Sequence, residues 1–280
     1  MTGIERIRAR FRRVNGRGEA ALIPYVVAGY PDMAKTREVL WQCYEAGANL
    51  IEVGIPFSDP VADGPTIARA SQHALEQGAT PAKCLDLIRS LRKEGLDVPI
   101  LGMTYANLLY APGYRKVARQ WAAAGLDGAI VPDLPAEEAR ELRSAFTAHG
   151  LATTFFAAPS TSDARIQRSL AASTAFLYLV AVYGTTGARA SISKDTFELL
   201  ARVRRLRAAR ATPLCVGFGV SEPEHVKRLR GAGADGVVVG SALVRKIDQG
   251  KTIRHFLKSL KMATVDRRRP SATTVAAQAI

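Results

Sequence analysis

Three carboxylates fall within twelve residues of the segment IEVGIPFSDPVADGP, residues 51–65: Glu52, Asp59 and Asp63. Glu52 interrupts an apolar run that has the composition of a buried β-strand. Because side chains alternate along a strand, Glu52 shares a face with Gly54, and the β-branched residues around it share the other face. The glycine leaves open volume beside the acid. We therefore expect Glu52 to point into a site at the end of its strand.

A carboxyl group enclosed by apolar side chains resists ionisation, because burial penalises the charged form. We expect a raised pKa for Glu52 and a group that can both donate and accept a proton. The alternative is a structural glutamate in a buried ion pair. It is disfavoured because a buried carboxylate is costly without a designated partner. Asp63, in the loop ADGP before a helical segment, suits either catalysis or a place in the N-terminal turn or cap of that helix. Asp59, in SDP, is predicted to be a turn residue or a surface contact.

Glycine-rich turns follow the last two strand-like segments. GFG at 217–219 comes directly after one of them, and Gly240 and Ser241 close the next, where a short helix should open. Backbone amides at such turns commonly hold a phosphate. We therefore predict phosphate contacts at Gly219, Gly240 and Ser241.

A second group of residues lies on or near strand ends and could line an apolar binding pocket. Ordinary core packing explains two of them, Met103 and Ile130, about as well. The predicted lining residues are Tyr25, Met103, Tyr105, Ile130, Tyr178 and Phe218.

The elements that must position these residues alternate regularly along the chain. Segments with helical periodicity separate eight apolar, β-branched runs, at 22–29, 49–55, 99–105, 128–133, 152–159, 175–182, 213–220 and 236–243. Strand–helix alternation predicts βαβ units and a parallel sheet. Eight such units in about 240 residues predict a closed (β/α)₈ TIM barrel rather than an open sheet. Catalytic groups of a barrel lie at the carboxyl ends of its strands.

Glycines mark where several helices end. EAGAN, AAGLD and GAGAD place a Gly just before the next strand, where a helix terminus favours positive φ. GAGADG at 231–236 also matches the dinucleotide pattern G-x-G-x-x-G. A helix precedes it and a strand follows, which is the reverse of a phosphate-binding turn, so we reject that function.

The net charge of +14 is concentrated at the chain ends, because residues 1–20 and 251–280 together carry +10. No aromatic platform accompanies the basic residues, which argues against nucleic-acid binding. The Arg-rich start is compatible with an organelle-targeting peptide, but the helical spacing of Ile4, Ile7, Phe11 and Val14 favours an N-terminal helix at the barrel bottom. Residues 265–280 are predicted to be a disordered basic tail, which leaves 1–264 as one catalytic domain.

Other function classes find little support. No apolar run approaches the roughly 20 residues needed to span a membrane. Cys43, Cys84 and Cys215 lack paired spacing, which is typical of reduced cysteines in the cytoplasm. The four histidines have no metal-ligand spacing, and we predict no metal.

The segment IEVGIPFSDPVADG resembles, position by position, the signature of the tryptophan synthase alpha subunit. The similarity continues through PYVVAGYPD, MTYANLLY, VPDLPAEE, GFGVSEPEHV and VVVGSALV, and covers roughly residues 1–264. It implies a lyase that cleaves indole-3-glycerol phosphate into indole and glyceraldehyde 3-phosphate, with Glu52 and Asp63 as its catalytic residues. It also implies no cofactor in this chain, because pyridoxal phosphate belongs to a beta subunit in an alpha2-beta2 tetramer.

The resemblance extends to two further regions. Thr186 and Gly187 match a lid residue and a third phosphate contact, and Asn107 and Asp133 match loops that face the beta subunit. The chain departs from the family pattern after the sixth strand, where it reads VAVYGTTGAR. Tyr183 and Thr185 are unusual there, which puts lid closure and communication with a partner in question.

The residue chemistry agrees with this family. Carbon–carbon cleavage needs an electron sink, and no Lys stands at the end of a predicted strand to form a Schiff base. Indole protonated at C3 becomes its own sink. Glu52 would donate that proton, and Asp63 would accept a hydrogen bond from the ring N–H and stabilise the developing positive charge. Two alternatives remain: a stand-alone lyase that releases free indole, and a non-catalytic scaffold whose basic ends bind an acidic partner.

Overall fold

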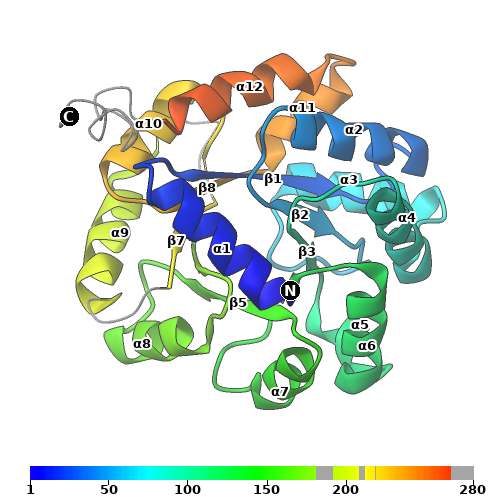
Figure 1. Cartoon of the computed structure of the whole chain (residues 1–280), viewed down its shortest axis with the longest axis horizontal. Coiled ribbons are helices and arrows are strands. Elements are labelled where there is room, and N and C mark those ends of the chain that lie inside the picture. Colours follow the sequence, from blue (N-terminus) through cyan, green and yellow to red (C-terminus); the bar gives the residue numbers. More distant parts are fainter. Residues whose placement is uncertain (181–191, 208–211, 218, 266–280) are drawn as a thin grey trace, which may run out of the picture.

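Eight parallel strands close into a barrel in the order β1-β2-β3-β4-β5-β6-β7-β8 (Figure 1). The structure is a computed structural model of the chain, and it describes residues 1–180, 192–207, 212–217 and 219–265. The strands are β1 (Ala21–Val27), β2 (Ile51–Gly54), β3 (Ile100–Met103), β4 (Gly128–Ile130), β5 (Ala152–Ala157), β6 (Leu177–Leu179), β7 (Leu214–Val216) and β8 (Gly236–Val239). The predicted (β/α)₈ TIM barrel is confirmed.

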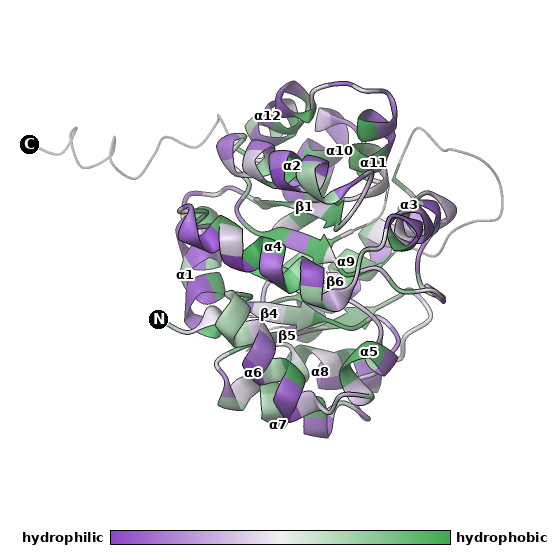
Figure 2. Cartoon of the chain, turned by 90° about the vertical axis from the view of Figure 1, so that its right-hand side faces the viewer, coloured by the Kyte–Doolittle hydropathy of each residue, from purple (hydrophilic) through white to green (hydrophobic). Residues whose placement is uncertain are grey.

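Helices surround the barrel and connect its strands. They are α1 (Gly3–Asn15), α2 (Met33–Glu45), α3 (Pro65–Glu76), α4 (Pro81–Lys93), α5 (Ala106–Tyr110), α6 (Tyr114–Ala124), α7 (Arg140–Ala148), α8 (Asp163–Ala172), α9 (Lys194–Arg207), α10 (Pro223–Gly231), α11 (Ser241–Asp248) and α12 (Ile253–Ala263). In the side view of Figure 2, apolar residues dominate the strands, and the outer helices carry polar residues on their outward faces. None of the helices in the described ranges is both long and apolar enough to cross a membrane.

Helix α1 crosses the barrel bottom, as predicted (Figure 1). Thr2 and Glu5 form a capping box at its start, in which Glu5 N–H donates to Thr2 Oγ1 at 3.2 Å and Thr2 N–H donates to the Glu5 carboxylate at 2.8 Å. Ile7 and Phe11 are buried, and the Phe11 ring packs edge-on against Phe176 of the barrel interior at 6.1 Å. This contact closes the bottom of the barrel, which is the end opposite the carboxyl ends of the strands.

The predicted strand runs are longer than the strands themselves. The run at 236–243 ends as helix, because α11 begins at Ser241. The runs are too long because the apolar residues continue beyond the hydrogen-bonded strands into loops and the first turns of helices, which are also buried. The predicted glycine termini are confirmed, since Gly47, Gly125 and Gly233 all have φ near +90°. The predicted tail lies outside the described residues from position 266 onward.

The strand registers arrange the interior side chains in layers of four from alternate strands. One layer holds Glu52, Ile130, Tyr178 and Val238. The layer nearer the mouth holds Tyr25, Met103, Phe156 and Gly217. Glu52 therefore lies one layer below the carboxyl ends of the strands.

Candidate active site

Glu52 is the only acid in its interior layer, and its side chain is fully buried. Both of its carboxylate oxygens lack a hydrogen-bond partner among the described residues. Burial raises the pKa of Glu52 well above its ordinary value. The inward orientation and the raised pKa are confirmed, and the ion-pair alternative is wrong for the described part of the chain. An unpartnered carboxyl group whose burial favours the protonated form is available to exchange a proton with a bound molecule.

Tyr25, from the layer nearer the mouth, and Tyr178, from the same layer as Glu52, enclose the acid. Gly54 and Gly217 leave room for the two tyrosine rings. A Cβ atom on Gly54 would lie 2.2 Å from Tyr25 Oη, and a Cβ on Gly217 would lie 2.0 Å from Tyr178 Cε1. Burial raises the pKa of both phenols well above the ordinary value. The two hydroxyl groups therefore remain protonated beside the acid.

Asp63 lies on the loop between β2 and α3, and Tyr105 holds it there. Tyr105 Oη donates to Asp63 Oδ2 at 3.0 Å and accepts from Ala62 N–H at 3.1 Å. Burial raises the pKa of Asp63 to about 6, and the bond from Tyr105 partly offsets this effect. The N-cap of α3 is Gly64, without a side-chain cap, so Asp63 does not cap that helix. The capping alternative is wrong, and one carboxylate oxygen remains for a ligand.

Asp59 is exposed and accepts a 2.5 Å hydrogen bond from Ser58 Oγ. The prediction that it is a turn or surface residue is confirmed. Its exposure distinguishes it from Glu52, which is buried, and from Asp63, which is partly buried.

The predicted phosphate turns meet at the same end of the barrel. Gly219 follows β7 with φ +75°, and Gly240 follows β8 as the N-cap of α11, whose first residue is Ser241. The N-terminal amides of a helix attract anions. Phe218 and the predicted contacts Thr186 and Gly187 lie outside the described residues, as do the lid residues Tyr183 and Thr185.

The predicted apolar lining is largely buried in the interior. Ile130 and Tyr178 belong to the layer of Glu52 and are buried. Tyr25 and Met103 belong to the layer nearer the mouth, where Tyr25 is buried and Met103 is partly exposed. Tyr105 has an additional role, because its hydroxyl group holds Asp63. Two aromatic residues were missed: Phe156 stacks on Tyr178 at 5.0 Å, and Phe57 stacks on Tyr105 at 5.3 Å. Strand alternation in ATTFFAAP could have identified Phe156.

Asn107 lies in α5, which follows β3, Asp133 lies on the loop after β4, and both are exposed. Asp133 Oδ1 accepts a hydrogen bond from Ala106 N–H at 2.9 Å, which fixes the start of α5. Their side chains are therefore on the outside of the barrel mouth rather than beside Glu52.

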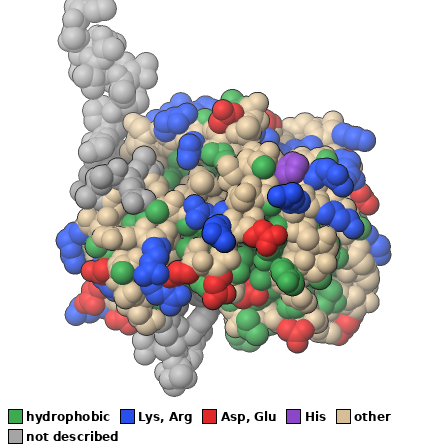
Figure 3. Space-filling model, turned by 90° about the horizontal axis from the view of Figure 1, so that it is seen from below, with side chains coloured by type: hydrophobic (Ala, Val, Ile, Leu, Met, Phe, Trp, Pro, Cys, Tyr) green, Lys and Arg blue, Asp and Glu red, His purple; other side chains and the backbone are tan. Residues whose placement is uncertain are grey.

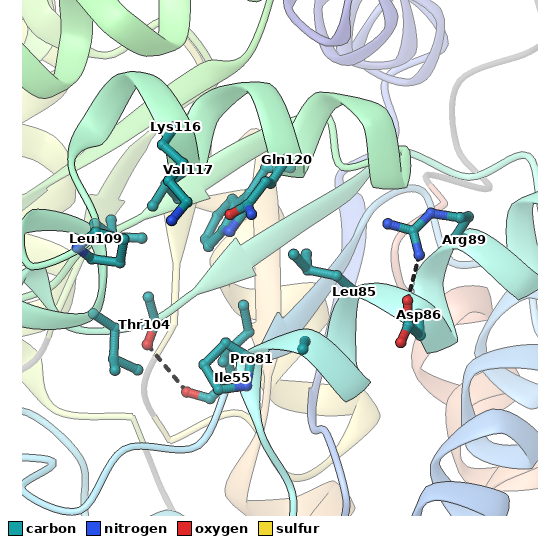
Figure 4. Close-up of a pocket in the computed structure, with 14 residues that line it drawn as sticks. Ile55, Pro81, Leu85, Asp86, Arg89, Thr104, Leu109, Lys116, Val117 and Gln120 are labelled. Atoms are coloured by element: carbon teal, nitrogen blue, oxygen red, sulfur yellow. Dashed lines mark hydrogen bonds and ion pairs between the residues drawn. The ribbon is translucent and has the colours of Figure 1, made fainter.

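A groove of about 420 Å³ lies outside the barrel between α4 and α6 (Figure 4). Thr104 Oγ1 donates to the Ile55 carbonyl at 3.2 Å at its floor. Neither Glu52 nor Asp63 lines this groove. The groove is therefore separate from the site of Glu52 and Asp63.

On the face shown in Figure 3, Lys and Arg side chains are interspersed with Asp and Glu rather than gathered in one basic track. Around α8, Arg165 pairs with Glu137 at 3.0 Å and Arg202 pairs with Asp163 at 2.5 Å. The described residues contain no group of three or more His, Cys, Asp or Glu side chains that could hold a metal ion.

The fold and the site define a (β/α)₈-barrel enzyme with one buried carboxyl group, Glu52, and one partly buried carboxyl group, Asp63, near the carboxyl ends of its strands. Residues 11–270 match the family model described as tryptophan synthase alpha chain. The alpha chain of Methanosarcina barkeri is 43% identical over 256 residues, which are 91% of this chain and 94% of that protein.

Solved structures agree with the sequence comparison. Tryptophan synthase from M. tuberculosis, in an open form with BRD0059 bound, has a TM-score of 0.83 and 34% identity, covering 92% of this chain and 98% of that chain. The tryptophan synthase a2b2 complex from Pyrococcus furiosus has a TM-score of 0.80 and 41% sequence identity, and the match covers 88% of this chain and 98% of that chain.

The chain belongs to the tryptophan synthase alpha chain family. The predicted lyase class and the role as an alpha subunit in tryptophan biosynthesis are thereby confirmed. Alpha chains need no cofactor of their own, because pyridoxal phosphate is in the beta subunit.

Proposed function

We propose that this chain cleaves indole-3-glycerol phosphate into indole and glyceraldehyde 3-phosphate, with Glu52 as the acid–base residue and Asp63 as the electrostatic stabiliser. The observation that carries the proposal is the Glu52 carboxyl group, which is fully buried, has a raised pKa and has no hydrogen-bond partner in the described chain. A group without a structural partner is free to act on a substrate.

The reaction divides into two proton movements. Protonated Glu52 donates its proton to C3 of the indole ring, which becomes an iminium ion. The carboxylate then accepts the proton of the side-chain hydroxyl group as the C3–C1′ bond breaks, and its electrons neutralise the iminium. The products are indole and the aldehyde, and Glu52 is protonated again. No oxidant or reductant is required.

Asp63 is suited to stabilise the intermediate. Its pKa of about 6 leaves it ionised at neutral pH, while burial favours the protonated form of Glu52. An ionised oxygen facing the ring N–H stabilises the positive charge that develops there. Tyr105, which donates to the other oxygen, orients the carboxylate.

The substrate's ends would bind on opposite sides of the mouth. Gly219, Gly240 and Ser241 would contact the phosphate, together with Thr186 and Gly187 from outside the described residues. Tyr25, Met103, Ile130 and Tyr178 would line the indole site, with Phe218 also outside the described residues. The helix terminus at Ser241 and the aromatic layer support this division.

A beta subunit is the expected partner, in an alpha2-beta2 tetramer like the named Pyrococcus complex. Exposed Asn107 and Asp133 are candidates for that contact, as their family positions imply. Family membership favours this function over a stand-alone lyase and over a non-catalytic scaffold.

The proposal includes a cytoplasmic location and a single catalytic domain at 1–264. All three cysteines, Cys43, Cys84 and Cys215, are buried and unpaired, which fits a reducing compartment. The basic segment 265–280 is proposed to be dispensable.

The direct test is indole release from indole-3-glycerol phosphate by the purified chain, with and without added beta subunit. The account expects slow release alone and faster release with the partner. A chain that releases no indole under either condition would refute the lyase assignment. Equal rates under both conditions would favour the stand-alone alternative.

A further inference from the structure

Three side chains from three elements meet beside the barrel mouth. Arg69 of α3 donates to Tyr30 Oη at 3.0 Å and to Asp248 Oδ2 at 2.5 Å, and Tyr30 donates to the other oxygen of Asp248. The Arg69 guanidinium also lies 5.6 Å from the centre of the Tyr30 ring. We call these three residues the α3–α11 clamp.

The turn that carries Tyr30 is itself fixed against α3. Tyr30 is 7% exposed, and its ring packs edge-on against His73 at 5.4 Å. The His73 side chain hydrogen-bonds the Pro31 carbonyl through Nε2 at 3.1 Å. The clamp therefore joins Asp248 to a rigid unit made of α3 and the turn after β1.

The two helices of the clamp carry opposite ends of the proposed site. Asp63 lies two residues before the start of α3, and α11 begins at Ser241 directly after Gly240. Helix α11 has eight residues and is therefore about 12 Å long. A displacement of its last residue, Asp248, is transmitted to its first turn because so short a helix moves as one body.

Apolar packing alone does not fix the rotation of α11. Ala242, Leu243 and Val244 are buried against the barrel, and such contacts are not directional. Within the described chain, the bond from Arg69 is the only hydrogen bond that joins α11 to α3. The clamp supplies the directional contact.

We propose that Tyr30, Arg69 and Asp248 are positioning residues that set the phosphate-binding turn at the start of α11 relative to Asp63. This inference rests on the proposed phosphate contacts at Gly240 and Ser241. The clamp fixes the separation between the anion end and the ring end of the site, so it selects substrates by length. It touches no substrate atom and acts only through the placement of α11.

The test compares Asp248→Ala and Tyr30→Phe with a matched control. Arg37, Ser90 and Glu94 form a similar arginine–hydroxyl–carboxylate cluster between α2 and α4, in which Arg37 donates to Ser90 Oγ at 2.8 Å. The control variant Glu94→Ala removes the carboxylate of this second cluster, which does not lie at the barrel mouth. For each variant we would measure inorganic phosphate binding by calorimetry, competitive inhibition by indole, and KM and kcat for indole release.

Asp248→Ala should weaken inorganic phosphate binding and raise KM by about 3- to 10-fold, a range expected for a partly exposed charge network. The inhibition constant of indole and kcat should stay within about twofold, because the ring end is held by other elements. Tyr30→Phe should shift phosphate binding in the same direction by a smaller factor. Asp248→Glu, which keeps the carboxylate, should restore most of the affinity.

Phosphate affinity unchanged in both clamp variants would overturn the inference, as would an equal loss in Glu94→Ala. A fall in kcat with unchanged phosphate affinity would also overturn it, because the clamp would then act on Asp63. Failure of the lyase assignment has a different signature: wild type would release no indole, whatever the calorimetry shows.

Discussion

At the scale of single residues, the site depends on two carboxyl groups with different environments. Glu52 is enclosed and unpartnered, whereas Asp63 is partly open and bonded to Tyr105. Burial raises the pKa of Asp63 to about 6 and that of Glu52 well above its ordinary value. Their difference lets one group hold a proton while the other is ionised at the same pH, which is the division of labour that the reaction requires.

The pH dependence of cleavage should report Asp63. Its pKa in the folded chain is raised to about 6, so activity should be lost as pH falls through that value. Asp63→Asn should abolish this acid limb and lower kcat by about 10²–10³. Rate–pH profiles of the two proteins would check this, and an unchanged limb in Asp63→Asn would assign it to another group.

Asp63 also affects stability, with a definite sign. Because burial raises the folded-state pKa above the unfolded value, the native chain binds more protons than the unfolded chain between about pH 4 and pH 6. Stability therefore falls as pH rises through this window. Asp63→Asn should remove its part of this slope and leave the part that Glu52 contributes, because burial raises the pKa of Glu52 as well. Urea melts of both proteins at pH 4.5 and 7 would measure the difference.

Tyr105→Phe is a sharper probe of the same carboxylate. The lost hydrogen bond to Asp63 Oδ2 had lowered the pKa of Asp63, so the acid limb should move to higher pH. The maximal rate should fall less than in Asp63→Asn, since the charge remains. A limb that moves to lower pH would contradict the assigned bond.

At the scale of elements, the strands position the site, and glycines on them leave room for large side chains from the neighbouring layer. Gly217→Ala would place a Cβ 2.0 Å from Tyr178 Cε1 and displace that buried ring. We expect a loss of activity of at least about tenfold and a destabilisation of about 1–3 kcal/mol. Gly231→Ala is the control, because a Cβ there meets nothing within 4 Å. Equal effects at both positions would show that the ring contact is unimportant.

Sequence periodicity predicted these elements better than it predicted their contacts. Alternation placed Glu52 inside the barrel, and glycine turns located the start of α11 to within a residue. Period and composition could not show that Tyr105 reaches Asp63, or that Arg69 pairs with Asp248 across 179 positions. Such pairs depend on side-chain length and direction in the folded state.

At the scale of the whole molecule, the domain should end at Thr264. Thr264 is buried, and its carbonyl accepts a hydrogen bond from Ala20 N–H at 3.1 Å. A chain truncated after Thr264 should melt within about 2 °C of the full chain and keep its activity, since the sequence of the removed segment has no apolar periodicity to bury. Removing Thr264 as well should destabilise the fold. Thermal melts and indole release would distinguish the two truncations.

The central claim is that Glu52 moves the protons, and the most direct test is kcat for indole release by Glu52→Gln. The amide keeps the shape of the side chain but cannot donate an acidic proton. The account predicts a fall of roughly 10²–10⁴ with inorganic phosphate binding and the melting temperature retained. Wild-type turnover by the Glu52→Gln protein would contradict it.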